Sequence, residues 1–332
     1  MTSPTAERYL RFAEVEARGL SPRYEEWARG VAADPEVVAL IDRVPDAKRQ
    51  VNLVFGAARF HGAPDAPWPA ARDWIVAHWD LLEPTILERA TQTNEAARCA
   101  TLLPALDRVE GPVALLEVGT SAGLCLFPDR YSYEYRDADG VHSRHPSDGP
   151  STVVLPCDLD GVAVPRAVPE VVWRAGIDLN PLDVSSADDR AWLHALIWPE
   201  HDDRRARLHA AAEIARRDPP LLVRGDALVD LPAVAAAAPA EATLVVFHSA
   251  VLMYLSADGR ARFADTVRAI AAGRPTVWIS NESPSLLPGT AASLPPRPDQ
   301  QAVFALAVDG EAVALTHPHG RWVRGFGTSS SR

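Results

Sequence analysis

The most restrictive feature of this sequence is the segment from Gly111 to Gly123. After Gly111-Pro112, a compact and mostly apolar run, Val113–Val118, ends at Gly119 and is followed by small residues. Short apolar runs bounded by glycine are typical of buried strands, and the small residues after them indicate a tight turn. The segment therefore predicts a strand, a turn and the start of a helix.

Further apolar runs follow and alternate with helix-like stretches. Helical spacing is found from about Arg204 to Arg217 and in the row Phe263, Val267 and Ile270. The runs themselves are Leu221–Val223, Thr243–Phe247 and Thr276–Ile279. Such alternation predicts an α/β fold whose parallel sheet is covered by helices on both faces. Residues 302 to 326 add two expected strands around Asp309-Gly310, a hairpin signal.

Two parts of the chain depart from this rhythm. Residues 1–110 have apolar residues at helical spacing, such as Tyr9, Phe12 and Ala13, and predict an N-terminal helical domain. Residues 111–332 then form the sheet domain. Within it, residues 125–172 carry tyrosines at every second position and many turn residues, which predicts an insertion with extended elements that closes over the substrate.

Composition excludes several classes of protein. A net charge of -11 disfavours a broad nucleic-acid-binding surface, since phosphate neutralisation needs clustered Lys and Arg. No apolar run is long enough to span a membrane, and the first 20 residues lack the pattern of a secretory signal. Three widely spaced cysteines fit reduced thiols better than a disulfide framework. We expect a cytoplasmic protein with a small-molecule substrate, and the sequence does not predict an oligomeric state.

The turn Gly119-Thr120-Ser121-Ala122-Gly123 allows two interpretations. Glycines let the backbone approach a ligand closely, and a following helix would present free N–H groups to a cofactor. A dinucleotide site is disfavoured because Ser121 replaces the second glycine of G-x-G-x-x-G. The same residues match G-x-S-x-G, the nucleophile turn of α/β-hydrolases. Such a turn normally follows several strands, whereas the preceding sequence here is helical, so we favour the cofactor turn.

Four segments in order resemble the motifs of class I S-adenosylmethionine-dependent methyltransferases. They are the Glu117 strand with its glycine turn, Gly176-Ile177-Asp178-Leu179-Asn180-Pro181, Gly225-Asp226-Ala227, and the run from Val246 to Leu255. The resemblance implies a Rossmann-like sheet with an insertion after the first strand and turn. It also implies S-adenosylmethionine as the cofactor.

The whole chain also resembles an actinobacterial family known as domain of unknown function 2332. The resemblance lies in Gln92-Thr93-Asn94-Glu95, the Glu117 turn, the segment Trp173–Asp183 and Val246-Phe247-His248-Ser249. This family implies no activity.

The methyltransferase resemblance implies a set of cofactor-binding residues. Glu117 and Gly119 would face the methionine part of the cofactor, Asp178 the ribose hydroxyls and Asp226 the adenine amino group. A carboxylate suits a diol because it accepts two hydrogen bonds at once. The full expected set is Glu117, Gly119, Ser121, Gly123, Asp178, Asp226, His248 and Ser249. Asp178 and Asp226 could instead be turn or cap residues, a common use of aspartate.

Other polar residues are candidates for catalysis or substrate binding. His248, at the expected end of a strand, is the candidate general base, with a structural histidine as the alternative. Arg174 could bind an acidic substrate or form a structural ion pair. The remaining substrate candidates are Gln92, Asn94, Glu95 and Arg98, which could also be a solvated helix start, and Asn281 and Glu282, which with Ser280 could also be a polar loop. His317 and His319 are too few for a metal site, so no metal is expected.

The sequence thus favours an S-adenosylmethionine-dependent methyltransferase acting on a small molecule. A second possibility is a binding or regulatory protein that keeps the fold without catalysis. A third is a serine hydrolase that uses Ser121 with His248 or His317 and an acid such as Asp226.

Overall fold

The computed structural model describes residues 3–286 and 303–326, and the chain divides into two compact units. The helical unit comprises the chain up to Thr93 together with Ser185–Ala206. The sheet unit comprises Asn94–Val184 together with the chain from Arg207 onward. The sequence placed the boundary at residue 110, but residues 94–110 belong to the sheet unit and a later segment returns to the helical one.

The helical unit has short helices, several of which begin at a proline. Ser3, Ser21 and Asp34 cap α1, α2 and α3 through side-chain oxygens that accept backbone N–H groups, and a proline follows each cap. Proline suits this position because its missing N–H would have no helical partner there. The helices are α1 (Pro4–Arg11), η1 (Phe12–Ala17), α2 (Pro22–Ala32), α3 (Pro35–Ile41), η2 (Asp46–Lys48), α4 (Val51–Phe60), α5 (Trp68–Ala77), α6 (Trp79–Glu88), α8 (Ala187–Leu196) and the first part of α9 (Asp202–Arg217).

Aromatic side chains fill the core of the helical unit. Phe55 lies edge-on to Tyr24, with ring centroids 5.0 Å apart, and to Trp27, at 5.4 Å. Edge-to-face pairs of buried rings add stabilisation beyond the apolar area that they bury. These buried aromatic rings thus serve packing.

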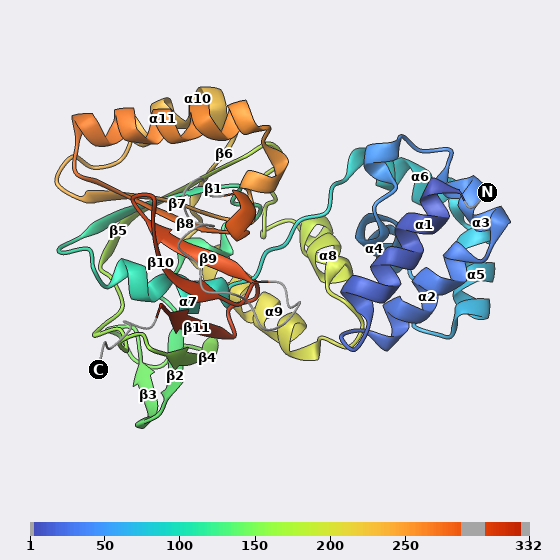
Figure 1. Ribbon diagram of the computed structural model, residues 1–332, viewed down its shortest axis with the longest axis horizontal. Coiled ribbons are helices and arrows are strands. Elements are labelled where there is room, and N and C mark those ends of the chain that lie inside the picture. Colours follow the sequence, from blue (N-terminus) through green and yellow to red (C-terminus); the bar gives the residue numbers. More distant parts are fainter. Residues whose placement is uncertain (1–2, 287–302, 327–332) are drawn as a thin grey trace, which may run out of the picture. The chain divides into compact units, whose positions relative to one another are not determined.

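The described residues of the sheet unit form one mixed sheet of eleven strands. Figure 1 shows this sheet with its strands labelled. The strand order is β3-β2-β4-β11-β10-β9-β8-β7-β1-β5-β6. The strands are β1 (Val113–Val118), β2 (Ser132–Asp137), β3 (Gly140–Arg144), β4 (Val154–Asp160), β5 (Val171–Asp178), β6 (Leu221–Arg224), β7 (Thr243–Ser249), β8 (Thr276–Glu282), β9 (Phe304–Val308), β10 (Glu311–Thr316) and β11 (Trp322–Gly325). All the strands expected from apolar runs are present, and the hairpin around Asp309-Gly310 is confirmed for the residues from 303 onward; residue 302 lies outside the described residues.

Five neighbouring strands, β6, β5, β1, β7 and β8, are parallel. β9 is antiparallel to β8, and β9, β10 and β11 then alternate in direction. The fold is therefore mixed α/β, as expected, with an unusual strand order in its second half.

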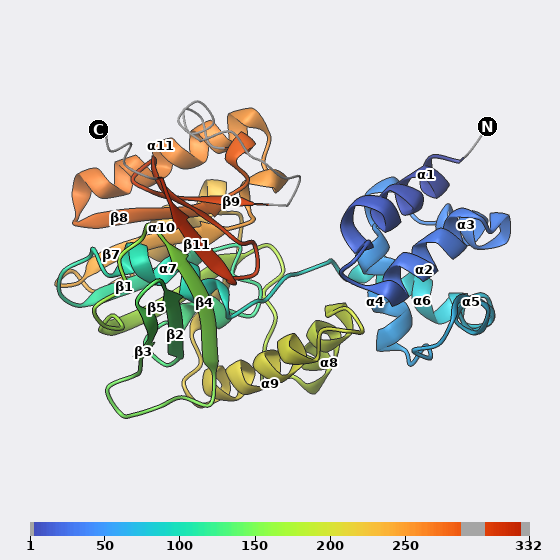
Figure 2. The same cartoon turned by 60° about the horizontal axis from the view of Figure 1, so that its bottom comes forward.

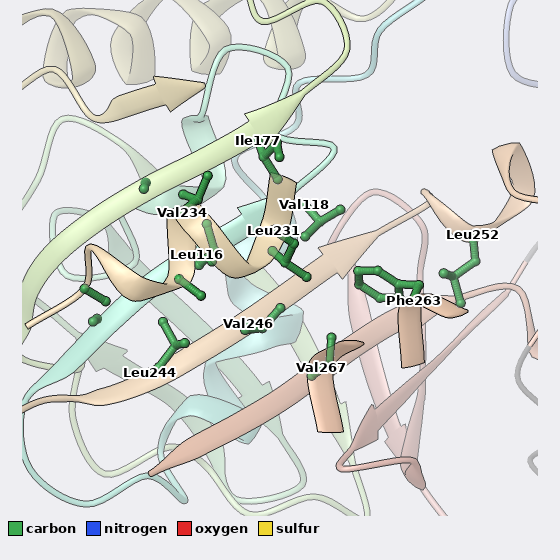
Figure 3. Packing of buried hydrophobic residues seen from close by; sticks show 14 of the residues in the cluster. Leu116, Val118, Ile177, Leu231, Val234, Leu244, Val246, Leu252, Phe263 and Val267 are labelled. Carbon is green, nitrogen blue, oxygen red and sulfur yellow. The ribbon is translucent and has the colours of Figure 1, made fainter. Parts of the chain in front are cut away.

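Helices cover both faces of the parallel strands (Figure 1). α10 (Ala227–Ala236) and α11 (Ala257–Gly273) lie on one face and α7 (Arg98–Leu106) on the other. Figure 3 shows alternate residues of β1 and β7, such as Leu116 and Val246, packed against Leu231 of α10 and Phe263 of α11. Their neighbours in β1, including Glu117, point to the face covered by α7. The short helices of this unit are η3 (Leu124–Leu126), η4 (Leu252–Tyr254) and η5 (Pro284–Leu286).

The expected insertion forms strands β2, β3 and β4, which extend the same sheet at its far end. β4 pairs in parallel with β11, so four strands separate the insertion from β7 (Figure 2). The buried hydroxyls of Tyr131, Tyr133 and Tyr135 donate hydrogen bonds to backbone carbonyls and so anchor the start of this insertion. The expectation of a cover over the ligand edge is therefore wrong, because these strands extend the sheet at the end away from β1, β5 and β7.

The turn after β1 does not lead into an α-helix, contrary to expectation. It is followed by the single helical turn η3, Leu124–Leu126, all of whose residues are buried. A three-residue turn provides no row of free N–H groups with an aligned dipole, so this turn lacks the helix start that both sequence interpretations required.

Candidate functional site

Polar residues form one row across the carboxyl ends of the parallel strands. The strand registers pair Val118 with both Ile177 and His248, and Ser249 with Asn281. One residue further along, Asp178, Gly119, Ser249 and Asn281 therefore stand side by side. In open α/β sheets, ligands bind outside this edge. The row brings together candidates from four separate parts of the sequence.

The glycine turn has a strained backbone conformation, which a residue from another strand stabilises. Gly119, Ser121 and Gly123 have φ values of 69°, 53° and 73°, in the left-handed region that glycine adopts most easily. The Asp178 carboxylate fixes this shape: it accepts hydrogen bonds from the backbone N–H of Ser121 and from that of Asn180, both at 2.8 Å. Asp178 therefore stabilises the turn, which is the structural role considered as the alternative to ribose binding.

Glycine at position 119 is needed for internal packing. A Cβ there would lie 2.4 Å from a methyl carbon of Val251, which follows β7. Gly176 likewise makes room for the side chain of Thr120, since a Cβ at position 176 would lie 2.4 Å from the Thr120 hydroxyl oxygen. Val251 thus fills the space beside Gly119 that a ligand would use for close backbone approach.

Glu117 is buried beneath the turn on the face covered by α7. Its Oε2 accepts a hydrogen bond of 2.8 Å from the Thr120 hydroxyl. Burial raises the pKa of the Glu117 carboxyl well above its ordinary value, and the nearby Cys125 thiol adds to this, while Thr120 and Arg98 oppose it. A buried carboxyl with a raised pKa favours the neutral acid.

The segment before α7 also reaches the row. The Asn94 side-chain oxygen accepts the Leu124 N–H at 3.2 Å, which ties the segment to the end of the turn. Glu95 forms a two-pronged ion pair with Arg207, at 2.7 and 3.2 Å. Arg98 donates from Nη1 to the Ser249 carbonyl and from Nε to the Pro318 carbonyl. Asn94, Glu95 and Arg98 are therefore parts of the sheet unit near the row, rather than a solvated helix start.

Ser249 and Asn281 continue the row on β7 and β8. The Asn281 amide nitrogen donates to the Ser249 hydroxyl at 3.2 Å, and its oxygen accepts from the Thr316 hydroxyl at 2.6 Å. Asn281 and Thr316 are completely buried, whereas Ser249 is partly exposed. Asn281 thus holds the Ser249 hydroxyl in place and belongs to β8, not to a polar loop.

His248 points into the core beneath α11. Its Nδ1 is 2.7 Å from Glu282 Oε1, and its Nε2 accepts a hydrogen bond of 3.0 Å from the indole N–H of Trp278. The indole nitrogen can only donate, so the His248 proton must be on Nδ1 and directed to Glu282. With both ring nitrogens bonded and no exposed surface, His248 cannot take a proton from a substrate. The structural interpretation of His248 and Glu282 is the one that this geometry supports.

Two further candidates have local structural roles. Arg174 forms a two-pronged ion pair with Asp129, at 2.9 and 3.1 Å, and lies over the ring of Phe127. Asp226 caps α10 through the Leu228 N–H, at 2.9 Å, and stays exposed. Arg174 is thus already neutralised, whereas the exposed Asp226 carboxylate remains accessible. Gln92 belongs to the helical unit.

Sequence reasoning missed Tyr254 and Thr316. Tyr254 is 71% exposed, and burial of part of its ring raises its phenol pKa, with Arg98, Glu282 and Asp178 near enough to influence it. Tyr254 therefore lies at the edge beside the row. The only signal in the sequence was its place a few residues after the His248 strand. Thr316 lies in the hairpin, and no local pattern indicates its pairing with Asn281.

The geometry supports neither a metal site nor the expected serine triad. Among residues 3–286 and 303–326, no three His, Cys, Asp or Glu side chains are grouped to hold a metal ion. His317 Nδ1 accepts the His319 N–H instead. Ser121 is buried, and both ring nitrogens of His248, the partner considered for it, already form hydrogen bonds.

A cavity of about 240 Å³ near Pro104, Gly161 and Val323 contains none of the candidate residues. Within the described part of the chain, no helix is long and apolar enough to cross a bilayer.

The fold and the row define a mixed α/β protein with a candidate ligand site at the carboxyl ends of its parallel strands. A family model described as "Uncharacterized protein conserved in bacteria (DUF2332)" matches residues 6–324. The chain belongs to this family, which spans both units. No curated protein and no solved structure matches the chain.

Proposed function

We propose that this protein binds S-adenosylmethionine at the carboxyl ends of β1, β5 and β6 and transfers its methyl group to a small molecule. The observation that carries the proposal is the order of the parallel strands. Along the sheet, β6, β5, β1, β7 and β8 are the third, second, first, fourth and fifth parallel strands of the chain. This is the order of nucleotide-binding Rossmann sheets, which bind ligands where the order reverses, here between β1 and β7. The glycine turn stands at that point.

The carboxylates at this edge suit the adenosyl part of the cofactor. Asp178 uses one hydrogen bond on each oxygen for the turn, and a carboxylate has about four acceptor positions. It can therefore hold the turn and still accept ribose hydroxyls. The exposed Asp226 follows β6, the next strand, and can accept a hydrogen bond from the adenine amino group. These two residues keep the roles that the sequence resemblance implied.

The site has less space for the methionine part of the cofactor than for the adenosyl part. Val251 occupies the space beside Gly119, so the methionine part would lie along Val251 and Ser249 rather than directly against the glycine. Glu117 would then support the glycine turn through its hydrogen bond with Thr120 and would not contact the cofactor directly.

The bound cofactor would supply an activated methyl group, and this chain would supply position and exclusion of water. Methyl transfer is an in-line displacement, so orientation of the acceptor is the main demand. We assign no general base, because the only ring expected to serve, that of His248, is fully bonded in the core. The proposal therefore favours an acceptor that is nucleophilic without loss of a proton.

The test is calorimetric titration of the full chain with S-adenosylmethionine and S-adenosylhomocysteine. Asp226→Asn is the main variant. Asp178→Ala would also release the glycine turn, so a loss of cofactor contact could not be distinguished from a change in the shape of the turn. Asp258→Asn, at an aspartate that is also exposed and lies at the start of α11, is the matched control. We expect saturable binding that Asp226→Asn weakens and Asp258→Asn does not.

Two other outcomes separate the alternatives. Binding without methyl transfer to any of a broad panel of acceptors would support the non-catalytic protein considered from the sequence. No binding of either compound by folded protein would overturn the proposal.

A further inference from the structure

Arg98 has an unusual environment for an arginine. Its exposure is 7%, and it is the only Lys or Arg that is buried among residues 3–286 and 303–326. Long charged side chains are almost never fully buried unless they are paired, since removing a charge from water costs several kcal/mol. A buried arginine therefore calls for a negative partner.

The described residues supply no such partner. Arg98 bonds only to two backbone carbonyls, those of Ser249 at 3.1 Å and Pro318 at 3.0 Å. Carbonyls satisfy N–H groups but carry no net charge. Nη2 makes no hydrogen bond with any described residue and is not sealed from solvent. The guanidinium thus retains donors for one more group.

The neighbouring acids are committed elsewhere. Glu95 is paired with Arg207, at 2.7 Å, and Glu282 Oε1 accepts hydrogen bonds from His248 Nδ1 and from the Val251 N–H, not from Arg98. Glu117 lies within electrostatic range of Arg98, but burial raises its pKa and favours its uncharged form. No acid of the described chain therefore forms an ion pair with Arg98.

Two other arginines show that this situation is not general. Arg174, with its side chain 10% exposed, has Asp129 as its counter-charge. Arg274 also bonds only to carbonyls, but it is partly exposed and caps the end of α10, where helix carbonyls concentrate negative potential. Arg98 has neither an acid nor a helix end of this kind.

Arg98 lies at the candidate ligand edge, so its remaining N–H donors can reach a ligand. Its bond to the Ser249 carbonyl places the guanidinium at the end of β7, next to the partly exposed Ser249 hydroxyl. Tyr254, 71% exposed, is near enough for Arg98 to lower its phenol pKa. The Arg98 cation and the Ser249 hydroxyl therefore lie where open α/β sheets bind ligands, with Tyr254 within electrostatic range.

We infer that Arg98, with the Ser249 hydroxyl, binds an oxyanion, a carboxylate or phosphate group, of a small-molecule ligand. The inference rests on the proposed function for the ligand's place at this edge, and it names the chemical class that the site selects. Arginine suits this task because its planar donors match both oxyanions. The anionic group is either the carboxylate of the cofactor or a group of the methyl acceptor.

The first experiment is thermal unfolding of the full chain in sodium phosphate and in sodium chloride at equal ionic strength. Phosphate stabilises proteins in general by exclusion from their surfaces, so the variants must isolate the specific part. We expect wild type to show a saturable rise in Tm with phosphate, and Arg98→Gln to lose it. Arg174→Gln, which removes a mostly buried but already paired arginine side chain, should lower Tm and keep the saturable response. An equal response in Arg98→Gln and wild type would overturn the inference.

The second experiment identifies the source of the anion and separates this inference from the proposed function. S-adenosylhomocysteine carries a carboxylate, and methylthioadenosine does not. If the anion is that of the cofactor, Arg98→Gln should weaken S-adenosylhomocysteine binding by about 10-fold or more and leave methylthioadenosine unchanged. If both bind wild type and Arg98→Gln equally while the phosphate response is lost, the anion belongs to the acceptor. A phosphate response that depends on Arg98 without any nucleoside binding would uphold the anion site and overturn the proposed function alone.

Arg98→Gln could fail to fold, and the wild-type protein then provides the test. Hydrogen exchange measured by mass spectrometry should show slower exchange in residues 249–254 and 95–100 when phosphate is added at constant ionic strength. Unchanged exchange in both segments would overturn the inference.

Discussion

The indole N–H of Trp278 donates to Nε2 of His248 at 3.0 Å, in the core beneath α11. This one bond fixes the tautomer of His248 and directs its Nδ1 proton to Glu282. The histidine at the end of β7 is therefore part of the packing that holds β7, β8 and α11 together. It stands close to the candidate site in sequence and faces away from it in space.

Replacing Trp278 by Phe should test this arrangement. The ring stays apolar and aromatic, but Nε2 of His248 loses its only donor and becomes a buried, unsatisfied acceptor. We expect a loss of about 2–3 kcal/mol in the free energy of unfolding, measured with urea. Trp173→Phe is the control, since this partly buried ring packs on the same core with no hydrogen bond of its indole to the described residues. Equal losses in the two variants would show that the Trp278 bond contributes nothing.

Glu117→Gln should change how stability depends on pH. Because the folded-state pKa of Glu117 is raised above its unfolded value, the folded chain holds a proton that the unfolded chain releases. Wild type therefore loses stability as pH rises from about 4.3 toward the raised pKa, by at most about 1.4 kcal/mol per pH unit from this group. Glutamine cannot ionise, so the stability of Glu117→Gln relative to wild type should increase with pH over that window. Urea unfolding between pH 4.5 and 8 measures the difference, and a constant difference would contradict the buried neutral acid.

Gly320→Ala should disrupt the loop that carries Pro318 to Arg98. Gly320 has φ 77°, and a Cβ there would lie 2.0 Å from the Ala97 carbonyl oxygen. Gly310, with φ 89° and open space around it, provides a matched glycine without the collision. We expect Gly310→Ala to cost about 1–2 kcal/mol from backbone strain alone, and Gly320→Ala to cost clearly more. Comparable values of Tm for the two variants would mean that the loop moves away from α7 easily.

The chain should not react with a serine-directed fluorophosphonate. Ser121 is 5% exposed, and the imidazole of His248, its expected activating partner, is bonded on both nitrogens. Intact-mass spectrometry after incubation should therefore show unmodified protein. An adduct that disappears in Ser121→Ala would revive the hydrolase interpretation.

Four of the five parallel strands could be predicted from the sequence because they are continuous apolar runs, whereas β5 was not predicted. β1, β6, β7 and β8 each contain the expected run, and β6, β7 and β8 extend it by one to three residues, since polar residues such as Ser249 and Glu282 continue the pairing beyond the apolar part. The helix after Gly123 was wrongly expected because small residues suit a helix start and a packed turn equally well. Asp178, which holds that turn, lies 55 residues after Gly123 in the chain, and no local pattern reveals such a contact.

The site shows the same division between local and distant information. Residues at strand ends, such as Asp178, Ser249 and Asn281, could be found from their positions in the runs. The direction in which His248 points could not, because a shift of one residue in a strand exchanges the two faces of the sheet. The counter-charges of Glu95 and Arg174 come from Arg207 and Asp129, so the isolation of Arg98 becomes visible only when every other pair is known.

The parallel pairing of β4 with β11 places a constraint on biosynthesis. β4 is complete once residue 160 has left the ribosome, but its partner, residues 322–325, is made last among the described strands. Until then, one side of β4 offers unpaired N–H and C=O groups, the kind of edge through which chains associate with each other. Contacts between such distant segments also form slowly, because a long loop must close first. The nascent chain thus completes the strands of its candidate ligand edge by residue 282 while the opposite end of the sheet is still open to aggregation.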